Sequence, residues 1–342
     1  MPNTNSLKTL LKNKTVLITG GTGSFGSFFI NKLLENTNFN LIKKVIVYSR
    51  DELKQTEMAQ KIEKRKLDKI RFFIGDIRDK DRLYRAMEDV DIVIHAAALK
   101  QVPIAENNPF EFIKTNVIGA QNVIDASLDN KVENVIALST DKAVSPINLY
   151  GATKLASDKL FTSANLMKGS KSIKFSVVRY GNVFSSRGSV VPLFIKLSEE
   201  KKTFTITDRK MTRFNMTLNE ACNFVFWCMS NNHGGEVFVP KLPSYRILDL
   251  AKAINPLSKI KVTGVRPGEK IFEELISRAD SLNTYDLGYC YSLLESIHEK
   301  TTKLYYKRKY KKVKTSFEYN SSNNKNFLSV NELQKLVKNH SK

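Results

Sequence analysis

Two residues with the spacing of a redox site lie near the middle of the chain: Tyr150 and Lys154. On a helix, residues at i and i+4 share one face. A free tyrosine has a pKa of about 10, so it is a poor base at neutral pH. A nearby ammonium and an oxidised nicotinamide ring, both positive, stabilise the phenolate and lower that pKa. The spacing predicts that Tyr150 takes a hydroxyl proton while a hydride leaves for a cofactor. The alternative is a packed tyrosine beside an exposed lysine.

A glycine-rich stretch, TGGTGSFG at residues 19–26, follows an apolar run and opens a helical pattern. Gly21, Gly23 and Gly26 satisfy the spacing G-x-G-x-x-G. Glycines here allow a tight turn and a close approach of the backbone to a pyrophosphate, whose charge then lies at the helix N-terminus. Between a strand and a helix near the start of the chain, the motif indicates dinucleotide binding. A plain glycine-rich turn is the alternative.

Short apolar runs alternate with helical patterns through the first half of the chain. The runs cover residues 15–20, 43–50, 70–76, 90–98, 132–140 and 174–183. This alternation predicts an α/β fold with a Rossmann-type, doubly wound parallel sheet. After about residue 182 the pattern becomes irregular, which suggests a smaller C-terminal α/β substrate region. We expect residues 1–182 to form the cofactor-binding and catalytic domain. We expect residues 183–342 to bind mainly substrate, with some segments returning to the first domain.

The composition narrows the class of protein. The chain has 342 residues, 42% of them hydrophobic, which is enough for one large domain or two. No run approaches the roughly 18 apolar residues of a membrane helix, and the N-terminus does not resemble a signal peptide. We therefore expect a soluble, cytoplasmic protein. Cys222, Cys228 and Cys290 have no C-x-x-C spacing, which predicts buried thiols and neither a metal site nor a disulfide framework.

The net charge of +21 permits binding to polyanions. Lysine is abundant throughout the chain, however, so a general composition bias is the simpler interpretation. The densest basic run, KLYYKRKYKKVK at residues 303–314, interleaves aromatic residues in a way that suits single-stranded nucleic acid. We expect instead a solvated strand or loop with a few buried tyrosines, and neither nucleic acid nor a membrane as partner.

The end of the second apolar run bears on the choice of cofactor. An NAD site usually has an acid there to hold the ribose hydroxyls. Here the run ends in YSRDE, where Ser49 and Arg50 can hold a 2′-phosphate, since an arginine fork suits phosphate oxygens. These residues favour NADP, while Asp51, one position later, keeps NAD possible. A surface arginine capping the loop is the alternative.

Several motifs together resemble a known enzyme family. T-G-x-x-G-x-x-G with Y-x-x-x-K is similar to the extended short-chain dehydrogenase/reductase superfamily, which acts on nucleotide sugars. Within it, a further set of motifs resembles the inverting UDP-N-acetylglucosamine 4,6-dehydratases of pseudaminic acid and polysaccharide biosynthesis. This set comprises YSRDELKQ, AAALKQVP, STDKAV, NLYGATKLASDKL, RYGNVFSSRGSVVP, MTRF, GVRPGEK and SSNNKNFLS. The similarity extends from about Lys14 to the last helix.

The resemblance implies a reaction. It converts UDP-N-acetylglucosamine to UDP-2-acetamido-2,6-dideoxy-beta-L-arabino-hex-4-ulose, with tightly bound NADP. After C4 oxidation, a base removes the C5 proton, an acid protonates the departing C6 hydroxyl, and hydride returns to C6. The family pattern places Asp141 and Lys142 in the acid and base roles, with Thr140 assisting Tyr150. Lysine in place of the glutamate of retaining relatives implies inversion at C5. As a base, Lys142 needs a pKa below its usual value of about 10.4, which burial and nearby positive charge favour and Asp141 opposes.

The resemblance also implies which residues bind the ligands. For the cofactor these are Gly20, Thr22, Gly23, Ser24, Phe25, Gly26, Ser49, Arg50, Asp51, Lys54, Asp76, Ile77, Ala96, Lys100, Leu138, Ser139, Tyr150, Lys154 and Val183. For the sugar nucleotide they are Lys100, Asn182, Arg187, Arg213, Arg266 and Glu269. Any of the charged residues can equally form a structural ion pair. Relatives assemble, so we expect a homo-oligomer, a dimer or a hexamer.

Two positions depart from single branches of the family. Gln101 stands where the pseudaminic branch tends to carry histidine, and Tyr150 stands where the capsule branch usually has methionine. The mixture bears on the pathway more than on the reaction, and Tyr150 favours pseudaminic-type sugars. Two other functions stay open. A UDP-sugar 4-epimerase would not need the pair Asp141–Lys142, and a non-catalytic, dinucleotide-sensing regulator would not need Tyr150 and Lys154.

Overall fold

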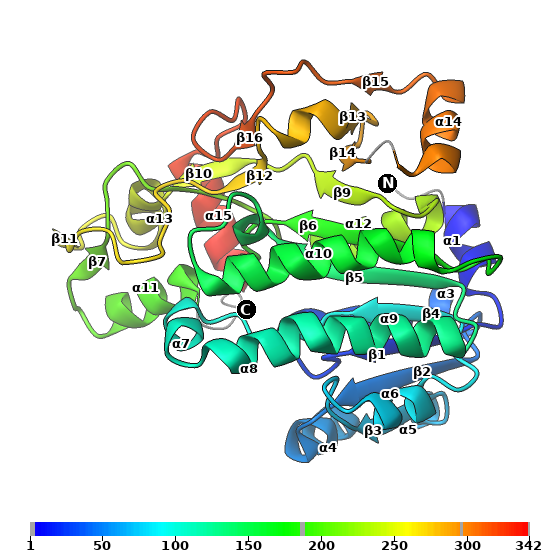
Figure 1. The fold of residues 1–342 in the computed structure, drawn as a ribbon. Coiled ribbons are helices and arrows are strands. Elements are labelled where there is room, and N and C mark those ends of the chain that lie inside the picture. Colours follow the sequence, from blue (N-terminus) through cyan, green and yellow to red (C-terminus); the bar gives the residue numbers. More distant parts are fainter. Residues whose placement is uncertain (1–3, 185–188, 295–296, 341–342) are drawn as a thin grey trace.

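A ten-stranded sheet forms the centre of the molecule, seen in a computed structural model that describes residues 4–184, 189–294 and 297–340. Six parallel strands run in the order β3-β2-β1-β4-β5-β6, the order of a dinucleotide-binding Rossmann sheet (Figure 1). Their bounds are β1 (Thr15–Thr19), β2 (Lys44–Ser49), β3 (Ile70–Ile74), β4 (Ile92–His95), β5 (Asn134–Thr140) and β6 (Lys174–Tyr180). The predicted α/β fold with its doubly wound parallel sheet is confirmed.

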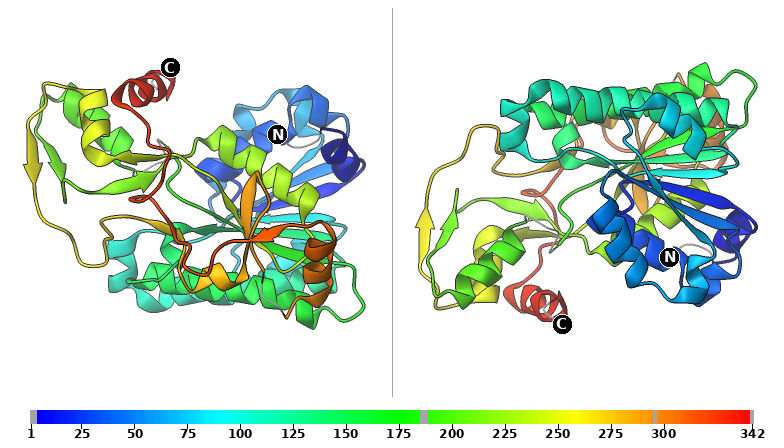
Figure 2. Two further views of the ribbon diagram at one scale, coloured as in Figure 1. Left: turned by 90° about the horizontal axis from the view of Figure 1, so that it is seen from above. Right: turned by 90° about the horizontal axis from the view of Figure 1, so that it is seen from below.

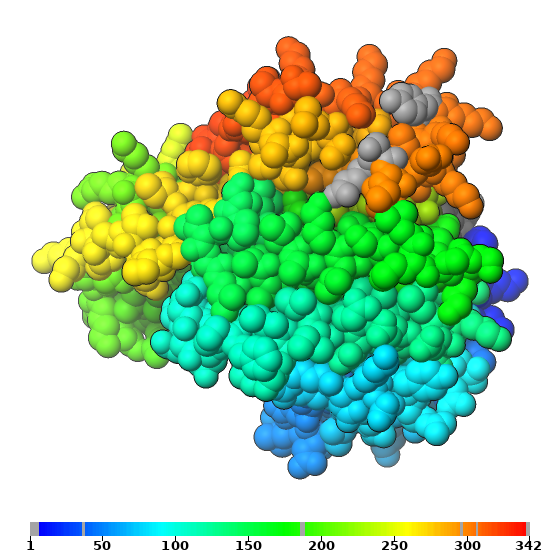
Figure 3. All heavy atoms as spheres, viewed as in Figure 1, coloured from blue at the N-terminus to red at the C-terminus, as the bar shows by residue number. Residues whose placement is uncertain are grey.

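Helices cover both faces of this sheet (Figure 2). One layer contains α1 (Thr4–Leu11), α2 (Ser24–Leu33) and α12 (Leu218–Asn231), and the other contains α6 (Lys80–Ala86), α9 (Gly119–Asp129) and α10 (Leu149–Met167). In the space-filling view α9 and α10 lie side by side and hide the sheet (Figure 3). Because both faces are covered, the inner strands are buried and mostly apolar. The side chains of β1 from Val16 to Ile18, for example, are fully buried.

The sheet continues with strands from the second half of the chain. β9 (Val237–Pro240) pairs parallel to β6, and β14 (Cys290–Leu293), β13 (Thr284–Asp286) and β15 (Lys311–Lys312) follow in antiparallel order. Segments after residue 182 therefore build part of the central sheet. The division at residue 182 stays a prediction about which part binds which ligand.

A smaller lobe stands beside one end of the sheet (Figure 2). Its elements are α11 (Val190–Glu199), β7 (Phe204–Ile206), β8 (Thr212–Phe214), β10 (Ser244–Arg246), α13 (Ile247–Ile254), β11 (Ile260–Val262) and α15 (Val330–His340). It has a hydrophobic core of its own, in which Phe194 stacks on Phe204 and the fully buried Leu250 and Leu333 take part. Between the lobe and the sheet, β12 (Glu274–Ile276) pairs with β16 (Tyr319–Asn320).

Short elements complete the described chain. They are α3 (Asn36–Phe39), α4 (Glu52–Gln60), α5 (Lys64–Leu67), α7 (Val102–Asn107), α8 (Pro109–Ile113), the π-helical turn η1 (Lys114–Ile118), the 3₁₀ turns η2 (Asp141–Ala143) and η3 (Asp280–Asn283), and α14 (Glu299–Lys307). No helix in the described ranges is long and apolar enough to cross a membrane.

The basic run differs from what we expected of it. Residues up to Lys307 belong to the helix α14, and only Lys311 and Lys312 pair as a strand. Tyr305 is fully buried and packs edge-on against Tyr285 and Tyr310. The expected buried tyrosine is therefore present, but it lies on a helix, where it packs against Tyr285 of β13 as well as Tyr310 of its own run.

The three cysteines are confirmed as buried thiols. Cys222 and Cys228 lie on α12 and Cys290 on β14, and all three are unpaired. Burial raises the pKa of each thiol, that of Cys222 to about 12. Buried thiols of this kind behave as small apolar side chains.

Candidate active site

The glycine loop joins β1 to α2. Gly20 has a φ of +67°, a conformation that side chains rarely adopt. A Cβ at Gly26 would lie 2.5 Å from the carbonyl oxygen of Gly20, so the loop closes on itself only because glycine occupies both positions. Gly23 precedes α2, whose first amides have no side-chain cap. Free amides at a helix N-terminus favour a phosphate group, so the loop fits a dinucleotide.

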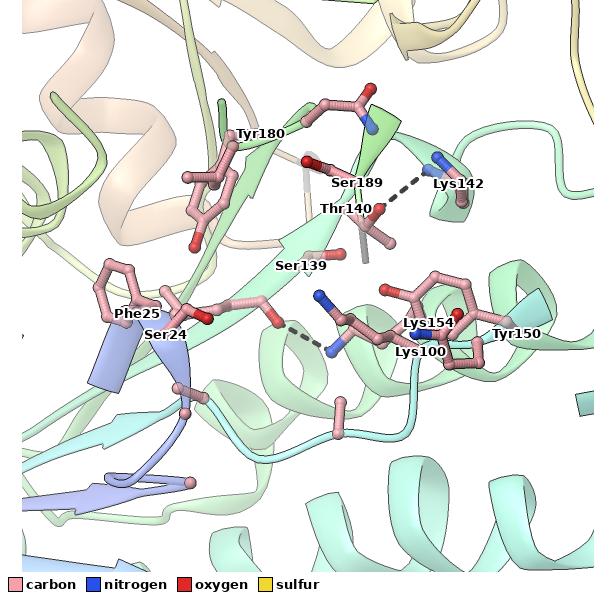
Figure 4. A pocket seen from close by; sticks show the side chains of 18 of the residues that line it. Ser24, Phe25, Lys100, Ser139, Thr140, Lys142, Tyr150, Lys154, Tyr180 and Ser189 are labelled. Carbon is pink, nitrogen blue, oxygen red and sulfur yellow. Dashed lines mark hydrogen bonds between the residues drawn. The ribbon is translucent and has the colours of Figure 1, made fainter. Parts of the chain in front are cut away.

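A cavity of about 650 Å³ lies at the carboxyl ends of the parallel strands, above this loop. In Figure 4, Ser24 and Phe25 occupy one side of it and Lys100, Tyr150 and Lys154 the other. The lining includes fourteen of the residues expected to bind cofactor: Gly20, Thr22, Gly23, Ser24, Phe25, Gly26, Lys54, Ala96, Lys100, Leu138, Ser139, Tyr150, Lys154 and Val183. Thr140, Asp141 and Lys142 line it too, so all five expected catalytic residues share one cavity.

The remaining expected cofactor residues lie outside that cavity, around the ends of β2 and β3. Ser49 is buried, and its hydroxyl oxygen accepts a hydrogen bond of 2.9 Å from the Gln55 amide. Asp51 caps α4: its carboxylate accepts from the backbone amide of Lys54 at 3.0 Å and pairs with the Lys54 ammonium at 2.6 Å. Arg50 keeps 56% of its side chain exposed. Of the three, the arginine is therefore the one free to meet a ligand phosphate.

Asp76 and Ile77 follow β3. The carboxylate of Asp76 pairs with Arg78 at 2.7 Å and lies 3.7 Å from Arg50. These arginines keep the pKa of Asp76 below its usual value, although burial opposes them. Ile77 is buried, and its carbonyl oxygen accepts from the Asn122 side chain at 3.0 Å. Both residues hold the loop after β3 at the edge where the adenine half of a dinucleotide lies in this fold.

Tyr150 and Lys154 lie on the first turns of α10, which Asn148 caps by accepting from the Gly151 amide at 2.8 Å. The Lys154 ammonium donates to the carbonyl oxygen of Leu138 at 2.8 Å, which aims it across the end of β5 (Figure 4). Burial lowers the pKa of Lys154. Burial also raises the pKa of Tyr150 to about 12, although Lys142 and the Thr140 hydroxyl oppose this rise. The protein groups alone therefore do not produce the phenolate that we expected with an oxidised nicotinamide present.

Asp141 and Lys142 begin the turn η2, directly after β5. The Thr140 hydroxyl donates to the Asp141 carboxylate at 2.8 Å, and the Lys142 ammonium lies 3.2 Å from the same oxygen. Asp141 is fully buried, and its second oxygen has no hydrogen-bond partner within the described residues. Burial raises the pKa of Asp141. A buried carboxyl with a raised pKa is suited to act as an acid.

Lys142 differs from the expectation of a lowered pKa. Burial does lower it, but the attraction of two carboxylates, Asp141 and Glu273, outweighs burial and raises the pKa above its usual value. Glu273 lies 2.9 Å from the Lys142 ammonium and is itself buried. Without ligands, Lys142 is therefore an ammonium, which must release a proton before it can act as a base.

Polar atoms without partners support the view that this cavity is built for a ligand. Besides the second oxygen of Asp141, the hydroxyl of Ser139, the amide oxygen of Asn182 and the hydroxyl of Ser189 are buried and unpartnered within the described residues. All four residues line the cavity. A buried polar atom without a hydrogen bond costs about 1–3 kcal/mol, so such atoms gather where a ligand or water pairs with them.

The expected substrate residues are only partly brought together. Lys100 and Asn182 line the cavity. Arg213 is buried behind it, where its guanidinium donates to the carbonyl oxygens of Thr212 at 2.7 Å and Ile271 at 3.1 Å.

The other expected substrate residues lie either on an exposed loop or outside the described residues. Arg266 and Glu269 belong to the exposed loop between β11 and β12, where the Arg266 amide donates to the Glu269 carboxylate at 3.3 Å. Arg187 lies outside the described residues.

Known proteins are similar to the chain over nearly its whole length. A family model described as "polysaccharide biosynthesis protein" matches residues 16–295. The chain belongs to this family. An inverting UDP-N-acetylglucosamine 4,6-dehydratase of Campylobacter jejuni is 52% identical over 334 residues, which cover 96% of this chain and 98% of that protein. The resemblance that the motifs indicated is therefore confirmed.

Two further proteins are similar to the chain over nearly its whole length. A UDP-glucose 4-epimerase of Rickettsia bellii is 42% identical over 331 residues, with 96% of each chain covered. Among solved structures, Pen from Bacillus thuringiensis is 38% identical, has a TM-score of 0.86, and is covered over 99% of its chain and 96% of this one. The fold of the chain, from the central sheet to the smaller lobe, is thus similar to that structure over nearly its whole length.

Sequence reasoning missed several cavity residues. Gln101, Val102 and Pro103 line the cavity from the start of α7, and Tyr180 lines it from the end of β6. Their position after parallel strands was the available signal, because loops at that edge meet at one site. Glu273 was missed as well, although it stands beside the RPGEK motif; no local pattern shows that it reaches Lys142.

Proposed function

We propose that this protein is an inverting UDP-N-acetylglucosamine 4,6-dehydratase. The observation that carries the proposal is the position of Asp141 and Lys142 in the same cavity as Tyr150 and Lys154. Hydride chemistry at C4 needs only the second pair; an adjacent buried acid and amine add what the removal of water across C5 and C6 requires. The 52% identity to a dehydratase of that name supports the same conclusion.

Each residue of the cavity has a role in this reaction. When bound, a nicotinamide dinucleotide accepts the C4 hydride and later returns it to C6. Tyr150, as a phenolate that Thr140 and Lys154 orient and stabilise, takes the C4 hydroxyl proton and becomes a neutral phenol. Lys142 removes the C5 proton, which the C4 ketone has made acidic. Asp141 protonates the C6 hydroxyl, which leaves as water, and C5 is reprotonated with inverted configuration.

We assign a nicotinamide dinucleotide to the glycine loop, and NADP in preference to NAD. Asp51 is occupied as the cap of α4 and by Lys54, so it is poorly placed to hold ribose hydroxyls. Arg50 is exposed next to it, with a 3.7 Å ion pair to Asp76, and its guanidinium suits a 2′-phosphate. The remaining cofactor residues keep the roles that the sequence indicated.

We assign the sugar nucleotide to the side of the cavity towards the smaller lobe. Lys100 and Asn182 line that space. Arg266 and Glu269 lie on the loop after β11, from which Arg266 can approach a diphosphate. Arg187 and Arg213 complete the proposed set, although Arg213 first needs to leave its backbone partners. Residues 183–342 would thus bind mainly substrate and residues 1–182 the cofactor.

A homo-oligomer and a place early in pseudaminic acid or related surface-glycan synthesis belong to the same proposal. Ile104 and Phe110 on α7 and α8 expose 53% and 57% of their surface. Exposed apolar side chains near one another suit contact with a second copy. The product, a 6-deoxy-4-keto sugar, suits later transfer of an amino group to C4.

The second candidate is a UDP-sugar 4-epimerase, favoured by the 42% identity to a protein of that name. Proton NMR of the purified protein with UDP-N-acetylglucosamine in deuterated buffer separates the two. We expect a new 6-deoxy methyl signal, deuterium at C5 and L-arabino couplings. Formation of UDP-N-acetylgalactosamine would instead identify an epimerase. If no reaction occurs, even with added NADP or NAD, the proposed substrate is wrong and a dinucleotide-sensing regulator becomes the favoured function.

A further inference from the structure

Glu273 is held rigidly next to the proposed acid and base. It immediately precedes β12, and its amide donates to the Ser321 hydroxyl at 3.0 Å while its carbonyl oxygen accepts from the Ser321 amide at 2.8 Å. Its side chain is 2% exposed. Burial of a carboxylate costs free energy unless the group is paired and hydrogen-bonded, so the partners of Glu273 indicate its role.

The charged side chains around Glu273 form a small cluster. One carboxylate oxygen lies 2.9 Å from the Lys142 ammonium and 3.6 Å from the Arg213 guanidinium. The other oxygen is buried without a partner within the described residues, as is one oxygen of Asp141. Titratable groups face Glu273 and Asp141 from several elements: Asp141 and Lys142 on η2, Tyr150 on α10, Arg213 on β8, Tyr245 on β10 and Lys270 before β12.

The two carboxylates of the cluster differ in the direction in which the site shifts their pKa. Burial raises the pKa of Glu273, but Lys142 and Arg213 outweigh it and keep that pKa low. Burial and the charge of Glu273 raise the pKa of Asp141. When two carboxylates share a site, the proton goes to the one with fewer positive neighbours. Here that carboxylate is Asp141.

We propose that Glu273 is a positioning residue for the elimination step: it stays an anion, holds the Lys142 nitrogen beside Asp141, and leaves Asp141 as the carboxylate that accepts the proton Lys142 gives up. The inference rests on the proposed dehydratase function. In the resting cluster, Lys142 is an ammonium and Asp141 a carboxylate, 3.2 Å apart. Transfer of one proton from Lys142 to Asp141 produces a neutral amine and a carboxylic acid, which are the forms that base and acid need.

The elimination then restores the starting state. The Lys142 amine takes the C5 proton and becomes an ammonium, while the electron pair of the C5–H bond forms the C5–C6 double bond. The C6–O bond breaks, its electron pair stays with oxygen, and the Asp141 proton completes the water molecule. Asp141 is again a carboxylate. Glu273 keeps its charge throughout and changes neither protonation nor position.

The test is the substitution Glu273→Gln, which removes the charge but keeps the shape. The matched control is Glu274→Gln, because Glu274 is adjacent in sequence but bonds to Ser145 instead. For Glu273→Gln we expect the rate of water loss to fall about a hundredfold. C4 oxidation, which uses Tyr150, should persist. Reduced nicotinamide should therefore accumulate, and its near-ultraviolet absorbance should rise.

A pH profile separates this role from a purely structural one. Without the charge of Glu273, the one proton that Lys142 and Asp141 share is lost at lower pH, so the alkaline limb of kcat should shift to lower pH. Glu273→Asp, which keeps the charge, should restore that limb.

Three results would overturn the inference. Two of them concern Glu273 alone and assume an active wild type. The first is that Glu273→Gln leaves kcat and the alkaline limb of its pH profile unchanged. The second is that Glu273→Gln slows C4 oxidation and the removal of water equally and also lowers the melting temperature. The third, a wild-type protein that does not dehydrate UDP-N-acetylglucosamine, would refute the proposed function and the inference with it.

Discussion

The Lys142 ammonium lies 2.9 Å from the Glu273 carboxylate, although 131 positions separate the two residues in the chain. Lys142 follows a strand of the Rossmann sheet, whereas Glu273 precedes a strand pair that joins the sheet to the smaller lobe. The acid–base half of the proposed site is therefore assembled by both parts of the chain. The redox half, with Tyr150 and Lys154 on α10, comes from the first part alone.

The first prediction concerns Asp141 as the acid. Asp141→Asn has nearly the same shape but no proton acidic enough to release water. We expect product formation to fall about 10²–10⁴-fold, the usual contribution of a general acid, while C4 oxidation continues. Proton NMR of the product and the absorbance of reduced nicotinamide measure the two steps. Asp286→Asn, at an exposed ion pair with Lys241, is the control. Product at the wild-type rate from Asp141→Asn would remove its role as the acid.

The second prediction concerns Tyr150. In Tyr150→Phe no group takes the C4 hydroxyl proton, so we expect both hydride transfer and water loss to fall about 10²–10⁴-fold. Single-turnover absorbance of the reduced nicotinamide should then stay flat, in contrast to Asp141→Asn. Tyr84→Phe, at a tyrosine 48% exposed on α6, should behave as wild type. Rapid appearance of reduced nicotinamide in Tyr150→Phe would show that another base serves C4.

The pattern of the first half of the chain was sufficient to predict the sheet and most of the cavity. Residues 15–20 and 132–140 are mostly apolar because their strands are covered on both faces, and this pattern can be seen in the local sequence. The edge of the sheet where catalytic and binding residues meet follows from the parallel order of the strands. Thr140 and Tyr150 were therefore expected in one place, and both line the cavity.

Effects that depend on distant contacts could not be predicted in the same way. The pKa of Lys142 is raised by Asp141, its neighbour in sequence, and further by Glu273, which lies 131 positions away in the chain. Part of the basic run forms a helix because Tyr305 is buried against Tyr285. The central sheet gains β9, β13 and β14 because pairing partners are chosen in space, not along the chain. In each case a residue that is distant in sequence takes part in the contact.

The third prediction concerns Arg50 and the choice of cofactor. Arg50→Ala removes a charged partner of the 2′-phosphate, a contact worth about 1.5–3 kcal/mol. We expect the Kd for NADP to rise at least about tenfold and the Kd for NAD to stay the same, both measured by calorimetry on cofactor-stripped protein. The control Arg85→Ala removes an exposed arginine that pairs with Glu88. An equal effect on NADP and NAD would mean that Arg50 supports the loop and does not read the phosphate.

The last prediction concerns His95 and the stability of the fold in acid. His95 is completely buried at the end of β4, where its Nδ1 lies 2.8 Å from the Thr19 hydroxyl. Burial, helped by the charge of Lys154, lowers the pKa of His95 from 6.5 to about 3. The unfolded chain therefore binds a proton at this position below pH 6.5, whereas the folded protein does not until about pH 3. Stability is fully present above the unfolded value and is lost as the pH falls between the two values.

The expected size of this effect follows from the same linkage. Between about pH 7 and about pH 5, His95 should remove about 2 kcal/mol from the free energy of unfolding. Urea denaturation of the wild type and of His95→Gln at both pH values measures it. Glutamine keeps a polar partner for Thr19 but has no titration in this range, so the pH-dependent loss in the variant should be smaller by about that amount. Equal losses in the two proteins would mean that His95 takes up its proton in the folded state as readily as in the unfolded chain. That result would contradict the lowered pKa of a ring buried beside Phe161 and near the charge of Lys154.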